Sequence, residues 1–279
     1  MTPAGEPNTA PQHPSAGDTT PKPFPATGRR VLITGATSGL GLALAQGVAA
    51  AGDRVAVHTS GRPERAAEVR ATLPTVAAGP HAVVEADLGE PDAPPRLVAA
   101  VVEELGGLDV LVNNAAVNLP HPPVQTDYAS WRAAWEQHTA VNLLGTAGLS
   151  HQAAGQMIAQ GHGGRLVNIG SRGAFRGEPD HPAYGATKAA VHALGQSLAV
   201  ALAPHGIAVA SVAPGFIETP RVAPRLSGEE GAALRRQSPF GRVAAPEEIA
   251  AAVRWLASPE AEWSSGTVLD LNGASYLRT

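Results

Sequence analysis

The chain contains no cysteine, only 4% aromatic residues and only 16% charged residues. Without thiols it has no disulfide, no zinc–thiolate site and no cysteine nucleophile, and we expect a protein of a reducing compartment, the cytoplasm. It has no run of about 18 apolar residues, so a membrane-spanning helix is not expected. The balance of 20 basic and 24 acidic residues argues against a nucleic-acid binder that relies on bulk positive charge.

Residues 1–28 differ in composition from the rest of the chain. They include seven prolines, several Ala and Thr residues and a single aromatic residue, Phe24. Such a segment cannot bury enough apolar area to offset the entropy lost on ordering. The sequence therefore predicts a disordered Pro/Ala/Thr-rich tail over 1–28 and one domain over 29–279.

From residue 30 onward, short apolar runs alternate with Ala- and Leu-rich segments of helical spacing. Strands are predicted at 31–34, 55–58, 82–86, 110–112, 165–169, 208–212 and 267–271, and helices at 39–51, 64–72, 94–105, 127–160, 183–203 and 246–257. Apolar strands separated by helices indicate a parallel sheet covered on both faces. The expected fold class is α/β, a doubly wound, Rossmann-type, seven-stranded parallel sheet in a single domain.

A glycine-rich turn directly follows the first predicted strand. It reads Thr34-Gly35-Ala36-Thr37-Ser38-Gly39-Leu40-Gly41, with the spacing TGxxxGxG. Glycines permit a tight turn and a close approach of the backbone to a pyrophosphate, and the following helix presents free N–H groups to the phosphates. The turn therefore predicts a dinucleotide site.

Three further side chains are predicted near the same end of the sheet. Ser171 follows the fifth strand, and Tyr184 and Lys188 lie four residues apart on one face of a helix. A phenol is a poor proton carrier at neutral pH, but a nearby ammonium group lowers its pKa. This arrangement is typical of proton transfer to or from a substrate oxygen.

Together, these residues resemble the short-chain dehydrogenase/reductase family, in its short single-domain branch, over roughly residues 30–279. The motifs that carry the resemblance are, in order, the TGxxxGxG turn, Asp87-Leu88, Asn113-Asn114-Ala115, Asn142, Ser171, the Tyr184/Lys188 pair and Pro214-Gly215. The stretch from Pro214 to Tyr276 looks most like the 3-oxoacyl-[acyl-carrier-protein] reductases. One departure is Ala116, where the family usually has glycine.

The resemblance implies four catalytic residues. Tyr184 would be the general acid in reduction and the base in oxidation. Lys188 would hold the nicotinamide ribose and lower the Tyr184 pKa, and Ser171 would orient and polarise the carbonyl. Asn142, inside the predicted helix 127–160, would anchor a water that relays protons from Lys188, although a polar residue there is also compatible with a simple helix kink.

The resemblance also implies which residues bind the nicotinamide cofactor. They are Gly35, Thr37, Ser38, Gly39, Leu40, Gly41, Ser60, Arg62, Asp87, Leu88, Asn114, Ala115, Ala116, Tyr184, Lys188, Pro214, Gly215, Ile217 and Thr219. The second strand ends His58-Thr59-Ser60-Gly61-Arg62, with no carboxylate to bind ribose hydroxyls and repel a 2′-phosphate. Ser60 and Arg62 favour NADP(H), with NAD(H) possible, although Ser38 stands where many NADPH-using relatives have arginine.

These features predict an NADPH-preferring oxidoreductase that interconverts a carbonyl and a secondary alcohol. One alternative is a 3-oxoacyl-[acyl-carrier-protein] reductase, and another is a non-catalytic dinucleotide-binding redox sensor. The four catalytic residues favour an enzyme. A small free ketone, β-keto ester or secondary alcohol is favoured over an acyl carrier protein, because the expected docking sites near 160–162 and 204–206 carry histidine rather than lysine or arginine.

Other residues bear on metal binding, on assembly and on the surroundings of the site. The ten histidines show no metal-binding spacing, so no metal site is expected. Trp131 and Trp135 form a packing stripe in the core or at a subunit interface, and the uncharged segment 189–203 favours a homotetramer or homodimer. Arg172 and Arg176 either reach an anionic substrate or lie in a solvated loop, with the loop favoured. The segment from Phe216 to Phe240 is the expected lid.

Overall fold

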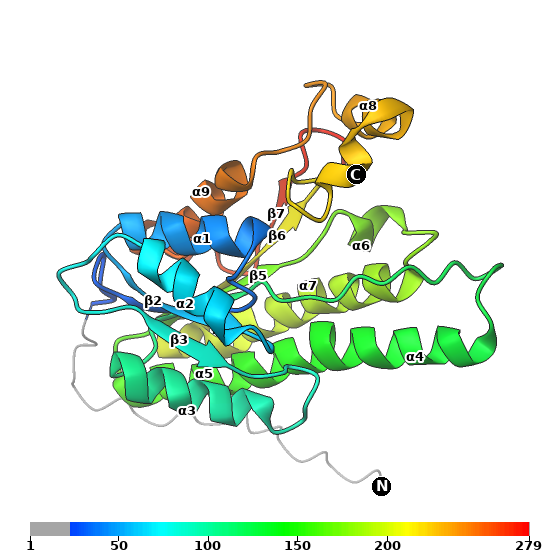
Figure 1. The fold of residues 1–279 in the computed structure, drawn as a ribbon. Helices are drawn as coiled ribbons and strands as arrows, with labels where there is room; N and C mark the ends of the chain where they lie inside the picture. Colours follow the sequence, from blue (N-terminus) through cyan, green and yellow to red (C-terminus); the bar gives the residue numbers. More distant parts are fainter. Residues whose placement is uncertain (1–22, 279) are drawn as a thin grey trace, which may run out of the picture.

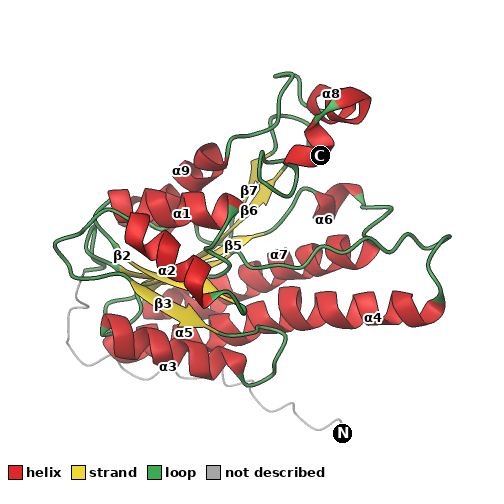
Figure 2. Cartoon of the chain, viewed as in Figure 1, coloured by secondary structure: helices red, strands yellow, loops and turns green. Residues whose placement is uncertain are grey.

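The computed structural model describes residues 23–278, which build one seven-stranded parallel sheet between two layers of helices (Figures 1 and 2). The strands are β1 (Arg30–Ile33), β2 (Arg54–Thr59), β3 (Ala82–Glu85), β4 (Val110–Asn113), β5 (Gly164–Ile169), β6 (Ile207–Pro214) and β7 (Val268–Leu271). Their order is β3-β2-β1-β4-β5-β6-β7. The predicted doubly wound topology is confirmed, and the order reverses between β1 and β4.

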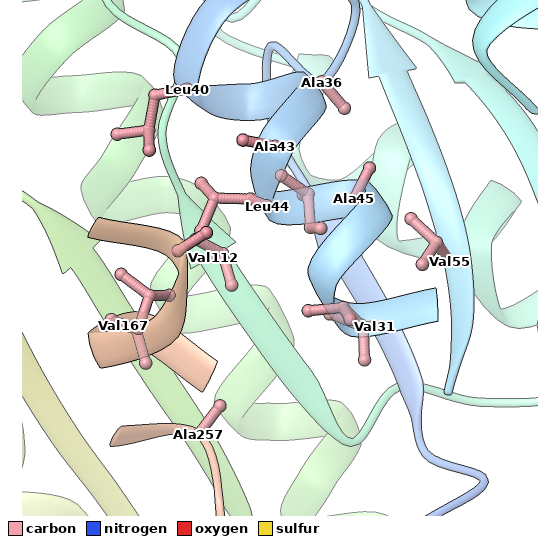
Figure 3. Packing of buried hydrophobic residues seen from close by; sticks show 14 of the residues in the cluster. Val31, Ala36, Leu40, Ala43, Leu44, Ala45, Val55, Val112, Val167 and Ala257 are labelled. Atoms are coloured by element: carbon pink, nitrogen blue, oxygen red, sulfur yellow. The ribbon is translucent and has the colours of Figure 1, made fainter. Parts of the chain in front are cut away.

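The five central strands, β2, β1, β4, β5 and β6, are buried on both faces, which explains their nearly continuous apolar runs. Successive side chains point to opposite faces, so Val31 and Ile33 contribute to one hydrophobic cluster and Leu32 to the other. The first cluster joins Leu44 of the first helix with Val31 of β1, Val55 of β2 and Val112 of β4 (Figure 3). The sheet thus rests on two separate cores, one under each helical layer.

The helices divide between the two faces. One layer contains α1 (Gly39–Ala50), α2 (Pro63–Thr72) and α9 (Pro246–Leu256); the other contains α3 (Ala93–Leu105), α5 (Thr146–Gln160) and α7 (Pro182–Leu202). α1 packs against α9, and α3 packs against α5. The predicted segments for these helices agree with the structure within one or two residues at most ends.

The predicted helix over 127–160 is not one regular helix. It consists of α4 (Tyr128–His138), a π-helical turn η1 (Thr139–Gly145) and α5. Asn142 lies in the π-helical turn and is buried. A π turn usually marks a place where side-chain contacts outweigh regular helix geometry, so the alternative of a local helix distortion at Asn142 is supported.

Two short helices were not predicted. α6 (Gly173–Arg176) lies just after β5, and α8 (Gly228–Arg236) lies within the expected lid. α6 is a single turn, and α8 contains two glycines, which weaken a helical sequence signal. α8 and the C-terminal segment lie beside each other at one end of the molecule (Figure 1), where Ser238 Oγ donates to the Gly273 carbonyl at 2.6 Å.

The predicted tail, 1–28, lies mostly outside the described residues. At its described end, Phe24 packs against the hydrophobic core, and the Arg165 guanidinium lies 4.2 Å from the centre of its ring. One aromatic side chain therefore anchors a proline-rich segment that composition alone assigns to the tail. Within residues 23–278, no helix has the length and apolar character needed to cross a membrane.

Candidate active site

The glycine-rich turn has the geometry that its sequence predicts. Gly35 and Gly39 have φ angles of +63° and +53°, which favour glycine. Gly41 has no room for a side chain, because a Cβ there would lie 2.1 Å from the Gly35 carbonyl oxygen. At the start of α1, the Ser38 side chain does not cap the helix, so the first backbone N–H groups are free of a side-chain partner.

Hydrogen bonds hold this turn against the end of β4. Thr34 Oγ1 accepts the backbone N–H groups of Asn114 and Ala115, each at 2.9 Å. Asn114 Nδ2 donates to the Thr34 and Gly35 carbonyls at 2.8 and 3.2 Å. β1 and β4 flank the point where strand order reverses, so these bonds shape the crevice in which such sheets bind ligands. Leu40, Thr37 and Leu88 are buried behind it.

His58 is a part of this site that sequence reasoning missed. Its Nδ1 accepts the Gly35 N–H at 3.0 Å, and its Nε2 lies 3.0 Å from the Ala86 carbonyl and donates to it. Burial lowers the pKa of His58 to about 4, so the ring is neutral and braces the glycine turn against β3. The spacing of His58 gave no signal, because its partners Gly35 and Ala86 lie in the connections that follow β1 and β3.

Acidification should therefore destabilise the protein through His58. Its folded pKa lies below its usual value of 6.5, so the unfolded chain binds more protons and stability falls as pH drops from about 6.5 to 4. Between pH 7 and pH 5 the loss attributable to this ring is about 2 kcal/mol. Urea unfolding at both pH values should show a smaller acid loss for His58→Asn than for wild type.

His151 provides the matched control, because it is exposed on α5. His151→Asn should leave the acid dependence as in wild type. His192 has a pKa lowered to about 4 by burial, so part of the acid loss should remain in both variants. An equal stability difference between wild type and His58→Asn at pH 7 and pH 5 would contradict this role.

The residues predicted to select the cofactor lie at the ends of β2 and β3. Ser60 and Arg62 are both exposed just beyond β2, and the Arg62 N–H donates to Thr59 Oγ1 at 3.2 Å. Asp87 is exposed beyond β3, and its Oδ1 accepts the Gly89 N–H at 2.9 Å. Arg62 therefore brings a positive charge to the end of β2, and Asp87 brings a negative charge to the end of β3.

Tyr184, Lys188 and Ser171 come together at the carboxyl ends of β5 and β6. Lys188 Nζ donates to the Ile169 carbonyl at 2.6 Å and lies 5.7 Å from the centre of the Tyr184 ring. Ser171, two residues after Ile169, accepts the Gly173 N–H through its Oγ at 3.0 Å. α7 and the end of β5 thus hold a phenol, an amine and a hydroxyl in one cluster.

Burial dominates the pKa shifts in this cluster. It raises the pKa of Tyr184, while hydrogen bonding with Ser171 and the charge of Arg221 act in the opposite direction. Burial also lowers the pKa of Lys188 to about 8, and the Lys188 amine donates to the Ile169 carbonyl. The lowering of the Tyr184 pKa by Lys188 stays a prediction.

Asn142 connects the π-helical turn to the segment that follows β4. Its Oδ1 accepts the Val117 N–H at 2.8 Å, and its Nδ2 donates to the Val117 carbonyl at 3.0 Å and to Thr187 Oγ1 at 3.2 Å. The side chain therefore fixes the backbone next to Ala116 and touches α7 between Tyr184 and Lys188. Ala116 itself is half-buried, so the methyl group is accommodated at the crevice.

The segment after β6 lies over the glycine turn. The Pro214 carbonyl accepts the Arg172 N–H at 3.0 Å, and the Gly215 N–H donates to the Leu271 carbonyl at 3.1 Å. A Cβ built on Gly39 would lie 3.2 Å from Thr219 Cβ, so the first lid residues approach the start of α1. Ile217 forms a parallel bridge with Ala244, which closes the base of the lid.

The arginines that follow Ser171 and the two tryptophans of α4 differ in burial. Arg172 is not in a solvated loop: it is 4% exposed and bonded within the protein, whereas Arg176 is exposed. Trp131 and Trp135 are half-buried with ring centres 6.0 Å apart, and Trp131 contacts His121 edge-on at 5.5 Å. The tryptophan stripe is therefore a packing feature beside the segment that follows β4.

The geometry of the glycine turn, the uncapped start of α1 and the close approach of Thr219 to Gly39 fit a dinucleotide with its phosphates at the helix N-terminus. The residues around Tyr184 fit the nicotinamide end, because the phenol, amine and hydroxyl lie at the same edge of the sheet. Among residues 23–278, no group of three His, Asp or Glu side chains could hold a metal ion.

Comparison with known proteins gives a consistent result. The family model described as enoyl-(acyl carrier protein) reductase matches residues 35–273. L-rhamnose 1-dehydrogenase (NAD(P)(+)) of Sphingomonas sp. (strain SKA58) is 36% identical, with 90% of this chain and 97% of that protein covered. The 3-oxoacyl-[acyl-carrier-protein] reductase of Aquifex aeolicus is 35% identical, with coverages of 89% and 98%.

A solved structure agrees with the fold. The crystal structure of a short-chain type dehydrogenase/reductase from Mycobacterium marinum superposes with a TM-score of 0.81 at 30% sequence identity. The match covers 91% of this chain and 98% of that one.

Proposed function

The chain belongs to the short-chain dehydrogenase/reductase family, and we propose that it is an NADPH-preferring enzyme that uses Tyr184 to move a proton to or from a substrate oxygen. Its family acts on alcohol and carbonyl groups with a nicotinamide dinucleotide. The observation that carries the proposal is the cluster of Tyr184, Ser171 and Lys188 beside the glycine turn. A panel of ketones and secondary alcohols, followed by nicotinamide absorbance, tests it.

Each residue in the cluster has a distinct role. The Tyr184 hydroxyl gives its proton to the carbonyl oxygen in reduction and takes it back in oxidation. The Ser171 hydroxyl donates a hydrogen bond to the same oxygen and positions it. Lys188 holds a positive charge near the phenol, which stabilises the phenolate formed after transfer. Asn142 fixes the backbone at Val117, and so the wall of the crevice.

The nicotinamide, when bound, supplies or accepts the hydride. The residues that would hold the dinucleotide are those of the glycine turn, with Asn114 and Thr219 flanking it and Lys188 at the ribose. The alternative of a non-catalytic redox sensor is disfavoured by the family's enzymes and by the intact cluster. Such a sensor would need the glycine turn but not Tyr184.

The cofactor preference rests on Arg62 and Ser60, which are exposed at the end of β2. Arg62→Ala should lower the ratio of kcat/KM with NADPH to kcat/KM with NADH by about tenfold, because a charge-assisted bond to the 2′-phosphate is lost. The measurement is initial rates with both cofactors. Arg65→Ala is the control, since Arg65 is an exposed arginine of α2 paired with Glu68 at 2.8 Å. A ratio that is unchanged in Arg62→Ala would contradict the assignment.

A small free carbonyl compound is the favoured substrate. Of the two predicted carrier docking sites, one contains His162, which lies 3.3 Å from Asp109 and is turned into the protein. One relative is named for a free sugar, L-rhamnose, and another for a 3-oxoacyl group on an acyl carrier protein. Free and carrier-bound substrates therefore both occur among relatives of about 35% identity. The test compares kcat/KM for an acetoacetyl carrier protein and a free β-keto ester. A carrier advantage that disappears at high salt would favour the carrier reductase instead.

The proposed enzyme is a cytoplasmic homotetramer or homodimer. α7 has no charged residue after Lys188, yet Ala193, Val200 and Ala201 are exposed, with Val200 81% exposed. Leu144, at the start of the neighbouring helical segment, is 62% exposed. Apolar exposure on adjacent helices supports a two-fold interface. Light scattering at micromolar concentration should give a multiple of 28.3 kDa, and a monomer would count against assembly.

A further inference from the structure

Arg172 is the unusual member of the buried arginines. Among residues 23–278, three arginines are buried: Arg29, Arg165 and Arg172, at 3%, 1% and 4% exposure. Arg29 pairs with Asp53 at 2.6 Å, and Arg165 pairs with Glu262 at 3.0 Å. Arg172 has no carboxylate partner within the described part of the chain. A buried charge without a counter-charge is costly, so this position calls for an explanation.

The contacts of Arg172 are all neutral. One terminal nitrogen donates to Ser275 Oγ, and the other donates to Gln237 Oε1 at 2.5 Å. The centre of the Phe216 ring lies 5.0 Å from its guanidinium carbon. These contacts orient the guanidinium between the lid and the C-terminal segment, but they do not neutralise it.

The nearby charges do not compensate either. Arg176 lowers the pKa of Arg172 more than Glu178 raises it, and with burial the pKa falls to about 10. The guanidinium therefore keeps its charge at neutral pH.

This charge borders a cavity of about 230 Å³ beneath the lid. Its apolar walls include Phe216, Leu234, Ile249 and Leu271, and Phe240 is 74% exposed at its edge. The cavity has a second arginine, but that side chain is already neutralised. Arg242 makes two bonds to Glu248, at 2.6 and 2.7 Å.

We propose that this cavity binds one carboxylate group attached to a small apolar body. A single uncompensated guanidinium matches a single negative charge, and its planar fork suits the two oxygens of a carboxylate. The aromatic and aliphatic walls suit an apolar body, and the small volume limits its size. A phosphate dianion would bring more negative charge than the site balances.

The position of Arg172 links this site to the catalytic cluster. Arg172 directly follows Ser171, and Gln237 and Phe216 belong to the lid. The carboxylate therefore comes either from the far end of the substrate or from a separate small ligand. Both sources present the same carboxylate to Arg172. The binding of such a group can therefore be measured by titration, without turnover of a substrate.

Isothermal titration of the full chain with benzoate tests the site directly. Wild type should bind benzoate, whereas benzamide, which has the same shape without the charge, and inorganic phosphate should bind at least about tenfold more weakly. Arg172→Met should weaken benzoate binding by about tenfold or more. Arg236→Met is the control, because Arg236 is exposed at the end of α8 and does not line the cavity, and it should bind benzoate like wild type.

A second variant covers the case in which Arg172→Met does not fold. Ala244→Phe fills the cavity and keeps Arg172, so it should also lose benzoate binding while thermal unfolding confirms a folded protein. Benzoate binding that persists in Ala244→Phe, equals benzamide binding, or is absent from wild type would overturn the proposal.

The source of the carboxylate is distinguished by kinetics on any active carbonyl substrate. Benzoate that raises KM alone indicates a site for the substrate's own carboxylate. Benzoate that changes kcat without competing indicates a separate ligand acting through the lid. If the enzyme reduces no carbonyl substrate, the proposed function is contradicted, but the benzoate titration still tests the carboxylate site.

Discussion

Replacing Tyr184 by phenylalanine should lower kcat by about 10²–10⁴-fold while nicotinamide cofactor binding stays within a few-fold of wild type. In the proposed mechanism the phenol exchanges a proton at the substrate oxygen, Ser171 positions that oxygen and Lys188 supplies a positive charge. The substitution keeps the ring, so packing on α7 is preserved. Steady-state kinetics with the best carbonyl substrate and fluorescence titration with NADPH measure the two effects separately.

Tyr128 provides the control for this substitution. It is 79% exposed at the start of α4, so Tyr128→Phe should leave both kcat and cofactor affinity unchanged. The burial that raises the Tyr184 pKa also keeps the phenol protonated at neutral pH, as an acid in the reduction direction requires. A Tyr184→Phe enzyme that reduces its substrate at the wild-type rate would remove Tyr184 from the mechanism.

The fold and much of the site follow from local sequence patterns. Buried parallel strands must be apolar on both faces, which makes them visible as short runs, and the TGxxxGxG turn needs glycine at positions fixed by backbone geometry. Tyr184 and Lys188 are visible because one helical turn separates them. Each of these signals is carried by residues close together in the chain.

Other parts of the site could not be predicted because they depend on tertiary contacts. His58 bonds to Gly35 and Ala86 on two different connections, and neither partner is implied by its own sequence neighbourhood. The burial of Arg172 depends on Gln237 and Ser275, which are 65 and 103 residues away. Arginine side chains are mostly exposed, so the residue type of Arg172 favoured a solvated loop, and this expectation was wrong.

The hydrogen-bond partner of the Lys188 amine also required the structure. Helical spacing places Lys188 and Tyr184 on one face, but it does not say where the amine points. The Lys188 amine donates to the Ile169 carbonyl, and burial is the largest cause of the pKa shifts of both groups. Proximity along a helix therefore predicted the pair but not the partner of the amine.

Gly41→Ala should destabilise the protein by about 3 kcal/mol or more and weaken NADPH binding by at least about tenfold. A Cβ at this position would lie 2.1 Å from the Gly35 carbonyl oxygen and 2.8 Å from Asn114 Nδ2. The first contact is with backbone, so relief requires the turn or α1 to move, and overpacking of this kind typically costs about 1–3 kcal/mol or more. Movement of the turn would also displace the N–H groups expected to bind the phosphates.

Gly47, six residues later in the same helix, separates this steric effect from the general effect of replacing glycine. A Cβ there meets only the Ala250 Cβ, at 3.9 Å, which is an ordinary contact. Gly47→Ala should therefore raise stability by up to about 1 kcal/mol, because alanine has the higher helix propensity. Thermal unfolding should move in opposite directions for the two variants, with Gly41→Ala lower by about 6 °C or more. If both alanine variants melt like wild type and bind NADPH equally well, the close approach of α1 to the turn does not control the site.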